Sequence, residues 1–401
     1  MTLFRAALVL GLLSAVGPFA IDLYLPAMPQ LAASLGIDEA GAQLTLTAYF
    51  VTFGLAQLFY GPWSDQSGRK MPLYAGLTLF IIGSVGCAMA PDIGWLLAAR
   101  ALQGVGAAVL MVVPRAIIRD MHTGTQATKL MAMVMLVISV SPMLAPLVGT
   151  ALVQLGDWRL LFWALSGVAI LSLVLTGTAL PETLARADRQ PINLRSLWAG
   201  SKVLLSDPAF MGLTLIGGFG MASFFVFIAN ASFVYQGQFG LTSTGFSLAF
   251  AINALGFFGA SQVAGPLGAR VGIVRLMGFG VFGFAGFTVA LMLLAVSGAA
   301  SLYVIVGMLF CANACLGVVI PTSMVVALDA HGRIAGLASS LGGTLQMLTG
   351  GVMIAITSLF VDGTALPMVV AIAMCGVAAL VLALLTLRRI SLDPATPPAI
   401  S

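Results

Sequence analysis

The sequence is poor in charge. Only 7% of its 401 residues are Asp, Glu, Lys or Arg, whereas about a quarter of an ordinary soluble domain is charged. Hydrophobic residues make up 60% of the chain. This composition excludes an ordinary soluble domain and predicts a protein that is embedded in a membrane.

Histidine and cysteine are also scarce, which limits metal and redox chemistry. The two histidines, His122 and His331, fall in predicted loops, and the four cysteines fall in apolar stretches, where a thiol behaves as a small apolar residue. No spacing of these residues is typical of a zinc site, so we expect no metal and no disulfide framework. The net charge is +4, but the bases are scattered over many loops, and we expect no nucleic-acid partner.

Motifs of enzymes and of ATP-driven pumps are missing. Neither H-E-x-x-H nor G-x-S-x-G occurs, and there is no G-x4-G-K-[ST]. The stretch "GFGVFG" at 278–283 matches G-x-G-x-x-G, but it lies inside an apolar run with no preceding strand, and 46 glycines make such matches common. We therefore expect neither an enzyme nor a nucleotide-driven pump within this chain.

Twelve apolar stretches are long enough to cross a bilayer. A membrane helix needs about 20 apolar residues, and these stretches lack the alternation of barrel strands. We expect an all-α membrane protein with twelve transmembrane helices in two pseudo-symmetric six-helix bundles. The predicted spans are residues 5–27, 43–63, 71–90, 94–114, 130–153, 159–180, 209–233, 244–265, 274–297, 300–326, 335–360 and 364–387.

The basic residues predict the orientation of these spans. If the N-terminus is cytoplasmic, nearly all Lys and Arg residues fall in cytoplasmic segments; Arg159 lies outside and Arg100 within a span. This distribution is the positive-inside rule for short loops. We expect both termini to be cytoplasmic and the first span to be retained, because eleven more spans follow it.

The chain divides at its longest polar stretch, residues 181–208, with six spans before it and six after it. An offset of 204 residues aligns 53–68 with 257–272 and matches Gly61 with Gly265 and Gly68 with Gly272. Two such repeats with a binding site at their interface are a transporter architecture. We predict an N-terminal bundle at 1–180, a cytoplasmic linker at 181–208, and a C-terminal bundle with a short cytoplasmic tail at 209–401.

The stretch "GPWSDQSGRK" at 61–70 places charge and glycine between spans 2 and 3. Its glycines permit a tight turn. Asp65 can accept hydrogen bonds from helix N-termini or pair with a nearby Arg. Either contact could latch the two halves together in one state of a transport cycle. The alternative is a basic turn that only sets topology. The candidate gating residues are Gly61, Asp65, Gly68, Arg69 and Lys70.

Two ionisable residues lie within predicted spans, Asp22 and Arg100. A charge in lipid costs about 2.5–3.5 kcal/mol on insertion scales, so such residues usually mark a pathway or a proton site. Both are predicted to lie near the outer ends of their spans, and Gln103, on the same helix face as Arg100, could bridge them. We predict Asp22 as the proton carrier; the alternatives are an interfacial Asp22 and an Arg100 that only ties helices together.

Span 5 contains "SPMLAPLVGT" at 141–150. Pro142, Pro146 and Gly149 can bend this helix and let span 8 pack closely. The alternative is a kinked helix with a packing role alone.

Polar and aromatic side chains in spans of both halves predict a mostly apolar cavity that suits neutral or weakly polar amphiphiles. Buried amides are costly to leave unpaired, so they are better candidates than phenylalanines, although hydrogen bonding between helices would also explain them. Twenty methionines add adaptable surface. The candidate substrate residues are Tyr24, Tyr49, Phe53, Met111, Met135, Phe224, Phe225, Asn230, Asn253, Phe257, Asn313 and Gln346.

Four motifs together resemble a known family: "IDLYLPAMP" in span 1, "GPWSDQSGRK", "RALQGVGAA" in span 4, and "PETL" after span 6. They are similar to the proton-coupled drug exporters of the major facilitator superfamily, in particular the bicyclomycin and chloramphenicol exporter subfamily. The resemblance implies that Asp22 and Arg100 belong to the coupling machinery and that Pro142 to Gly149 marks an antiporter. Ala145 and Thr150 depart from the family pattern G-P-x-x-G-G.

The expected function is proton-coupled efflux of small neutral or amphiphilic compounds, chloramphenicol- or bicyclomycin-like, by alternating access. Export or import of an endogenous metabolite is the alternative. The expected partners are a drug-like small molecule, protons and the lipid bilayer, with no cofactor besides the coupling ion. We expect a monomer in the bacterial inner membrane.

Overall fold

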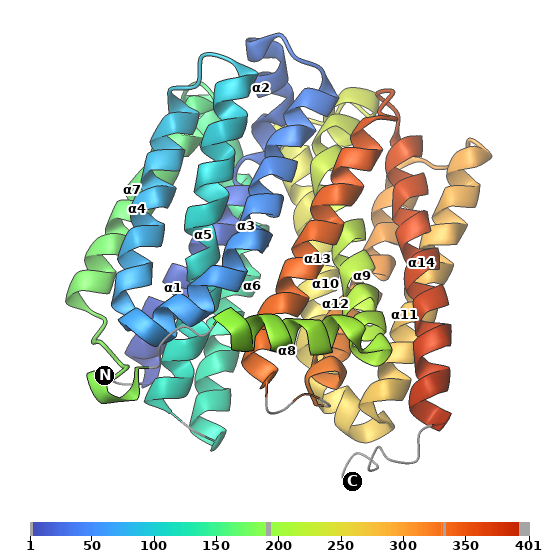
Figure 1. The fold of residues 1–401 in the computed structure, drawn as a ribbon. Coiled ribbons are helices and arrows are strands. Elements are labelled where there is room, and N and C mark those ends of the chain that lie inside the picture. Colours follow the sequence, from blue (N-terminus) through green and yellow to red (C-terminus); the bar gives the residue numbers. More distant parts are fainter. Residues whose placement is uncertain (1–2, 123, 190–193, 330, 332–333, 393–401) are drawn as a thin grey trace. The chain divides into compact units, whose positions relative to one another are not determined.

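The computed structural model describes residues 3–122, 124–189, 194–329, 331 and 334–392, and all regular structure in these ranges is helical (Figure 1). Within them, twelve helical stretches are long and apolar enough to cross a membrane, by length and composition. The prediction of an all-α protein with twelve spans is therefore confirmed.

The helices pack into two compact units. The first comprises Met1–Asn193 with Thr242–Leu248, and the second comprises Leu194–Leu241 with Ala249–Ser401. The predicted linker, 181–208, contains a helix that sequence analysis did not anticipate, whereas residues 190–193 and the predicted tail from 393 onward lie outside the described residues.

In the first unit, α5 packs against α3 and α4, α1 packs against α6, and α4 packs against α7. Its helices are α1 (Leu3–Asp22), α2 (Met28–Leu35), α3 (Glu39–Ser67), α4 (Lys70–Ala88), α5 (Ile93–Met121), α6 (Gly124–Leu155) and α7 (Arg159–Thr178), with 3-10 turns at Leu25–Ala27 and Arg186–Asp188.

In the second unit, α9 packs against α12, α13 and α14, and α11 packs against α12 and α14. Its helices are α8 (Leu194–Ser206), α9 (Pro208–Phe233), α10 (Ser243–Val271), α11 (Ile273–Val296), α12 (Leu302–Asp329), α13 (Ala335–Ser358) and α14 (Ala365–Leu392); a π-helical turn, η3 (Val234–Gln238), follows α9, and the first residues of α10 belong to the first unit.

Aspartates begin several of the long helices. The side chains of Asp38, Asp92 and Asp207 accept hydrogen bonds from backbone N–H groups in the first turns of α3, α5 and α9. These N–H groups have no partner within the helix, and a negative charge is favourable at the positive end of the helix dipole. Three of the chain's 13 acids are therefore used to start helices.

The first predicted span does not continue as one helix. Instead, α1 ends at Asp22, a 3-10 turn covers Leu25–Ala27, and α2 follows. Pro26 and Pro29 have no backbone N–H to donate, which explains why the helical hydrogen bonds change register here. Asp22 is consequently the last residue of α1, whereas the predicted span placed it several residues before a helix end.

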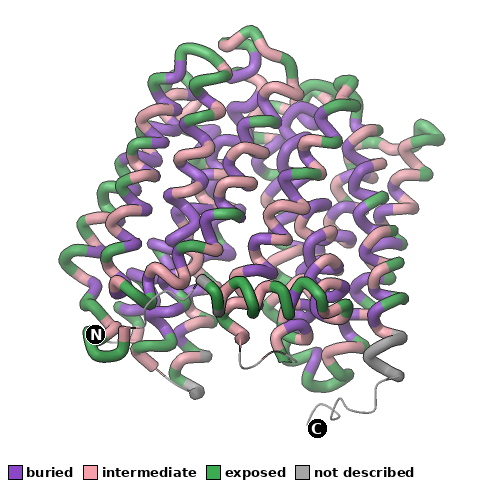
Figure 2. The backbone as a smooth tube through the Cα atoms, in the orientation of Figure 1, coloured by how far each residue is buried: buried purple, intermediate pink, exposed green. Residues whose placement is uncertain are grey.

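Buried residues lie mainly between the helices (Figure 2). Many of the exposed residues on the spans are large and apolar. Phe59 and Phe279 are 70% and 71% exposed. A soluble protein rarely exposes many large apolar residues together, but hydrocarbon lipid is their favourable solvent. The outward surface of the spans therefore fits a bilayer.

Candidate functional site

Arg100, on α5, lies in an aromatic cage in the first unit. Its guanidinium carbon lies 4.7 Å from the Tyr24 ring centroid, 4.9 Å from that of Tyr49 and 5.6 Å from that of Phe162. The side chain is completely buried. Aromatic faces attract a cation, and the attraction is strongest where water is excluded. The cage therefore stabilises a charge that the spans would otherwise disfavour.

The aromatic rings are themselves held in place. The Tyr24 hydroxyl lies 2.9 Å from Thr45 Oγ1, and the Tyr49 hydroxyl donates to the Gly17 carbonyl at 3.1 Å. Phe53 stacks on Tyr49 with ring centroids 5.9 Å apart. The structure thus brings two of the predicted substrate residues, Tyr24 and Tyr49, around Arg100 and places a third, Phe53, against Tyr49. The predicted Met111 and Met135 are half-buried on α5 and α6.

Gln103 does not bridge Arg100 to Asp22, as the sequence had suggested it could. Its Oε1 accepts from Arg100 Nη1 at 2.7 Å, while its Nε2 donates to Ser84 Oγ at 2.7 Å on α4. In this structure the amide oxygen of Gln103 binds Arg100 of its own helix, and its amide nitrogen binds Ser84 of the neighbouring helix. The bridge therefore ties α5 to α4.

Asp22 and Arg100 form no ion pair among the described residues. Asp22 is 4% exposed, and no hydrogen bond or ion pair of its carboxyl group is found there. Arg100 Nη1 instead reaches the Ala20 carbonyl at 3.5 Å, and its Nε and Nη2 have no hydrogen-bond acceptor among the described residues. The expected pairing is thus not formed in this structure, because α1 presents the Ala20 carbonyl, rather than Asp22, to the guanidinium.

A second polar cluster surrounds Arg69, between α3 and α4. Its guanidinium donates to Asp65 Oδ1, to Ser64 Oγ at 2.8 Å, and to both carboxylate oxygens of Asp120, at 2.7 and 3.1 Å. Burial lowers the pKa of Arg69, but the hydrogen bonds and charges of Asp120 and Asp65 outweigh burial and raise it. Arg69 is therefore a permanent cation that joins the end of α3 to the end of α5.

Glu182 holds the other side of this turn. Its carboxylate accepts from the backbone N–H groups of Arg69 at 2.9 Å, Lys70 at 3.2 Å and Leu184 at 3.1 Å. Burial raises the pKa of Glu182, but these three hydrogen bonds and the nearby Arg189 outweigh burial and lower it. The carboxylate caps the N-terminus of α4, where a negative charge is favourable.

The predicted gating residues therefore meet in one network, to which the structure adds three members. Gly68 provides the turn with a φ of 94°, which only glycine adopts readily, and Gly61 lies within α3. Asp120, Glu182 and Thr183 were not predicted as members of this network. The Thr183 hydroxyl donates to Asp120 Oδ2 at 2.9 Å. The motif "PETL", noted only as a resemblance, was the signal for two of them.

The helix α6 contains Pro142, Pro146 and Gly149. A Cβ atom at Gly149 would collide with the backbone carbonyl of Leu23, so only glycine lets α6 approach the end of α1 this closely. The Thr150 hydroxyl lies 2.9 Å from Ser247 Oγ, which also donates to the Pro146 carbonyl at 3.1 Å, all within the first unit. The departure from the family pattern at Thr150 thus supplies a hydrogen bond.

The remaining predicted substrate residues lie in the second unit, in separate groups. Phe224 stacks on Phe257 with ring centroids 5.3 Å apart. Asn313 donates to Asn253 Oδ1 at 3.2 Å across α12 and α10, which is the interhelical bonding that the alternative explanation of these amides requires. Gln346 is 8% exposed, and its Nε2 has no partner among the described residues. Phe225 and Asn230 are buried on α9.

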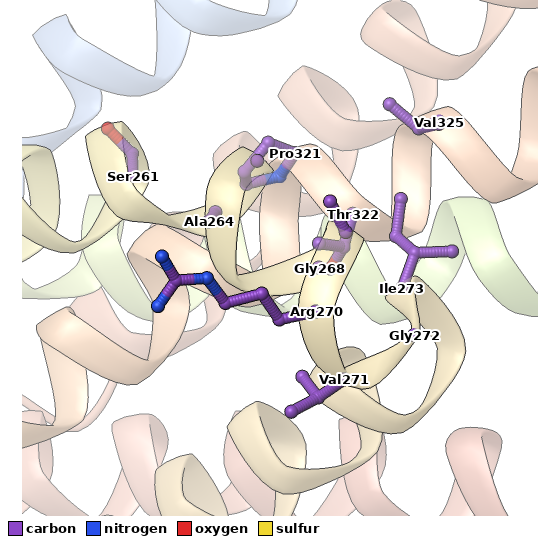
Figure 3. Close-up of a pocket in the computed structure, with 12 residues that line it drawn as sticks. Ser261, Ala264, Gly268, Arg270, Val271, Gly272, Ile273, Pro321, Thr322 and Val325 are labelled. Carbon is purple, nitrogen blue, oxygen red and sulfur yellow. The ribbon is translucent and has the colours of Figure 1, made fainter. Parts of the chain in front are cut away.

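A cavity of about 630 Å³ opens in the second unit beside the turn between α10 and α11 (Figure 3). Arg270, Ile273 and Thr322 are among its lining residues, and none of the predicted substrate residues lines it. With the 204-residue offset between the two repeats, Ile273 is the counterpart of Arg69 and Gly272 is the counterpart of Gly68. Gly272 also has a positive φ, of 89°. The turn is thus repeated without its charged network, and a cavity lies beside it.

Comparisons with known proteins agree with this architecture. The family model of the Major Facilitator Superfamily matches residues 10–354. The chain is 34% identical to an uncharacterised MFS-type transporter, YdgK, of Bacillus subtilis, over 90% of both chains. It is 27% identical to a bicyclomycin resistance protein homolog of Haemophilus influenzae, over 93% of this chain and 94% of that one. It is also 32% identical to multidrug resistance protein D of Escherichia coli, over 63% and 64%.

Solved structures share the fold at low identity. A peptide transporter, POT, in complex with sulfate superposes with a TM-score of 0.76 at 17% identity, over 97% of this chain and 94% of that chain. A D-xylose-proton symporter superposes with a TM-score of 0.73 at 18% identity, over 96% and 97%. The protein is therefore a transporter and not an enzyme, it spans the bacterial inner membrane many times, and it belongs to the Major Facilitator Superfamily.

Proposed function

We propose that this transporter exports small neutral or amphiphilic compounds, chloramphenicol- or bicyclomycin-like, in exchange for protons and by alternating access. The names of its relatives support efflux of antibiotics, since these include a bicyclomycin resistance protein homolog and multidrug resistance protein D. No cofactor besides the coupling proton is required. The protein acts as a monomer. Both of its termini lie in the cytoplasm, which is the orientation that the distribution of its basic residues favours.

The observation that supports proton coupling is the buried carboxyl of Asp22. It is 4% exposed and has no hydrogen bond or ion pair to another described residue. An acid in this setting is costly for folding and usually serves a proton or ion pathway. Asp22 is the proton site, and the caged Arg100 supplies a fixed positive charge on the neighbouring helix.

The residues near Arg69 are assigned a gating role. Asp65, Arg69 and Asp120 join three helix ends of the first unit through one guanidinium. This network would keep these ends together as one body when the bundles rock in alternating access. The predicted substrate residues near Arg100, Tyr24, Tyr49 and Phe53, form an aromatic wall that suits apolar ligands. In the second unit, Phe224 offers a ring face to a substrate, and Gln346 offers an amide donor that has no partner among the described residues.

The test is drug export by the full chain in proteoliposomes, with and without a proton gradient, using radiolabelled chloramphenicol. We expect gradient-dependent transport that Asp22→Asn abolishes, since an amide retains the size of the carboxyl but carries no proton. Asp157→Asn is the matched control, because it makes the same change at a half-exposed acid of the same unit. Gradient-driven transport by Asp22→Asn would place the proton site elsewhere, and no transport of any neutral antibiotic would favour an endogenous metabolite.

A further inference from the structure

The helix α8 differs from every neighbour in composition and direction. It runs across the direction of α9 and α13, against both of which it packs (Figure 1). It ends at Ser206, and α9, a candidate membrane span, begins at Pro208. Two residues cover at most about 7 Å. The C-terminal end of α8 is therefore held at the membrane surface by the chain itself.

One side of α8 is docked on its own unit. Leu204 is completely buried, and a Cβ atom at Gly200 would lie 2.7 Å from Leu337 Cδ2 of α13. The rest of the helix is largely exposed (Figure 2). The docked side fixes the rotation of α8 about its axis, so the exposed side has a defined composition.

The exposed side combines bases with large apolar residues. Arg195, Trp198, Lys202 and Leu205 are spaced by three and four residues and so form one stripe of the helix. Trp198 is 74% exposed and Leu205 is 47% exposed. Both bases are exposed, neither forms an ion pair among the described residues, and the helix contains no acid.

We propose that this stripe binds anionic phospholipid of the adjoining leaflet. Tryptophan favours the boundary between headgroups and acyl chains, and Leu205 can enter the same layer. The stems of Arg195 and Lys202 lie along this apolar surface while their charges reach the phosphates. Two bases with no acid on the same helix complement an anionic headgroup, whereas a zwitterionic lipid has no net charge for them to attract.

The experiment places the full chain in nanodiscs of phosphatidylcholine that contain a small amount of dansyl-labelled phosphatidylglycerol. Energy transfer from tryptophan to dansyl is measured, and subtraction of the Trp198→Phe signal isolates transfer from Trp198. Dansyl-labelled phosphatidylcholine serves as the uncharged comparison. We expect several-fold more transfer to the anionic probe at low salt, and less at high salt because salt screens exposed charges.

Charge variants separate α8 from the rest of the chain. Arg195→Gln with Lys202→Gln should remove most of the preference, so that transfer to the anionic and the uncharged probe becomes nearly equal. Arg270→Gln with Arg275→Gln removes the same charge from exposed positions of the same unit, and it should leave transfer from Trp198 unchanged. Each variant is accepted only if it remains monodisperse and keeps the melting temperature of the parent.

Three results would overturn the proposal: equal transfer to both probes, an unchanged preference after removal of Arg195 and Lys202, or an equal loss in the Arg270 and Arg275 variant. The first would mean that the stripe does not select anionic lipid. The last would mean that total charge, and not this stripe, recruits the lipid.

Discussion

Replacement of Asp120 by asparagine should destabilise the first unit more than the same replacement at Asp65, although both acids bind the same guanidinium. The Asp120 side chain is 17% exposed and contacts Arg69 through both oxygens, whereas that of Asp65 is 57% exposed and contacts it through one. Hydrogen bonds to charged groups contribute about 1.5–3 kcal/mol where they are shielded, and exposed ion pairs at most about 1 kcal/mol.

For a unit of this size, 1 kcal/mol corresponds to about 2–4 °C in melting temperature. We therefore expect Asp120→Asn to lower the melting temperature by about 3–12 °C and Asp65→Asn by less than about 4 °C. The assay is fluorescence-detected unfolding of the full chain in detergent, with Asp157→Asn as the control for an exposed acid. A loss at Asp65 equal to that at Asp120 would refute the assignment of the stability to the shielded contact.

Three further changes test other contacts. Because the pKa of Glu182 is lowered, the stabilisation that its carboxylate provides is present above the ordinary glutamate pKa and is lost as pH falls through the lowered value. Glu182→Gln should therefore flatten the decline in melting temperature at acid pH, and an unchanged decline would contradict this. Gly149→Ala should lower the free energy of unfolding by about 1–3 kcal/mol, because its methyl group collides with the Leu23 carbonyl. Gly167→Ala, in open space, should leave the melting temperature unchanged in the same unfolding assay. Arg100→Lys should retain part of the transport rate in proteoliposomes that Arg100→Ala loses, since a lysine keeps the charge without the planar fork. Equal transport rates in the wild type and both variants would mean that the Arg100 guanidinium has no role in transport.

Particular residues show how much of the site was accessible from sequence. The turn at 61–70 was predicted because glycine and charge are conspicuous between apolar spans, and Asp22 and Arg100 because ionisable residues are rare in lipid. The partners of Arg69 that are distant in the sequence were not predicted. Asp120 and Glu182 follow Arg69 by 51 and 113 residues, and nothing in local spacing marks acids so distant as partners of the side chain and the backbone N–H of one arginine.

Composition and hydropathy alone determined that the protein is helical, that it has twelve spans, and that it is embedded in a membrane, because each helix must satisfy its own backbone in lipid whatever its neighbours are. Only the tertiary structure decided which polar side chains meet. It gave Arg100 an aromatic cage in place of Asp22 and turned Gln103 toward Ser84. Such choices depend on the rotation of each helix about its axis, which is set by packing against other helices and leaves no separate signal in the sequence of any one span.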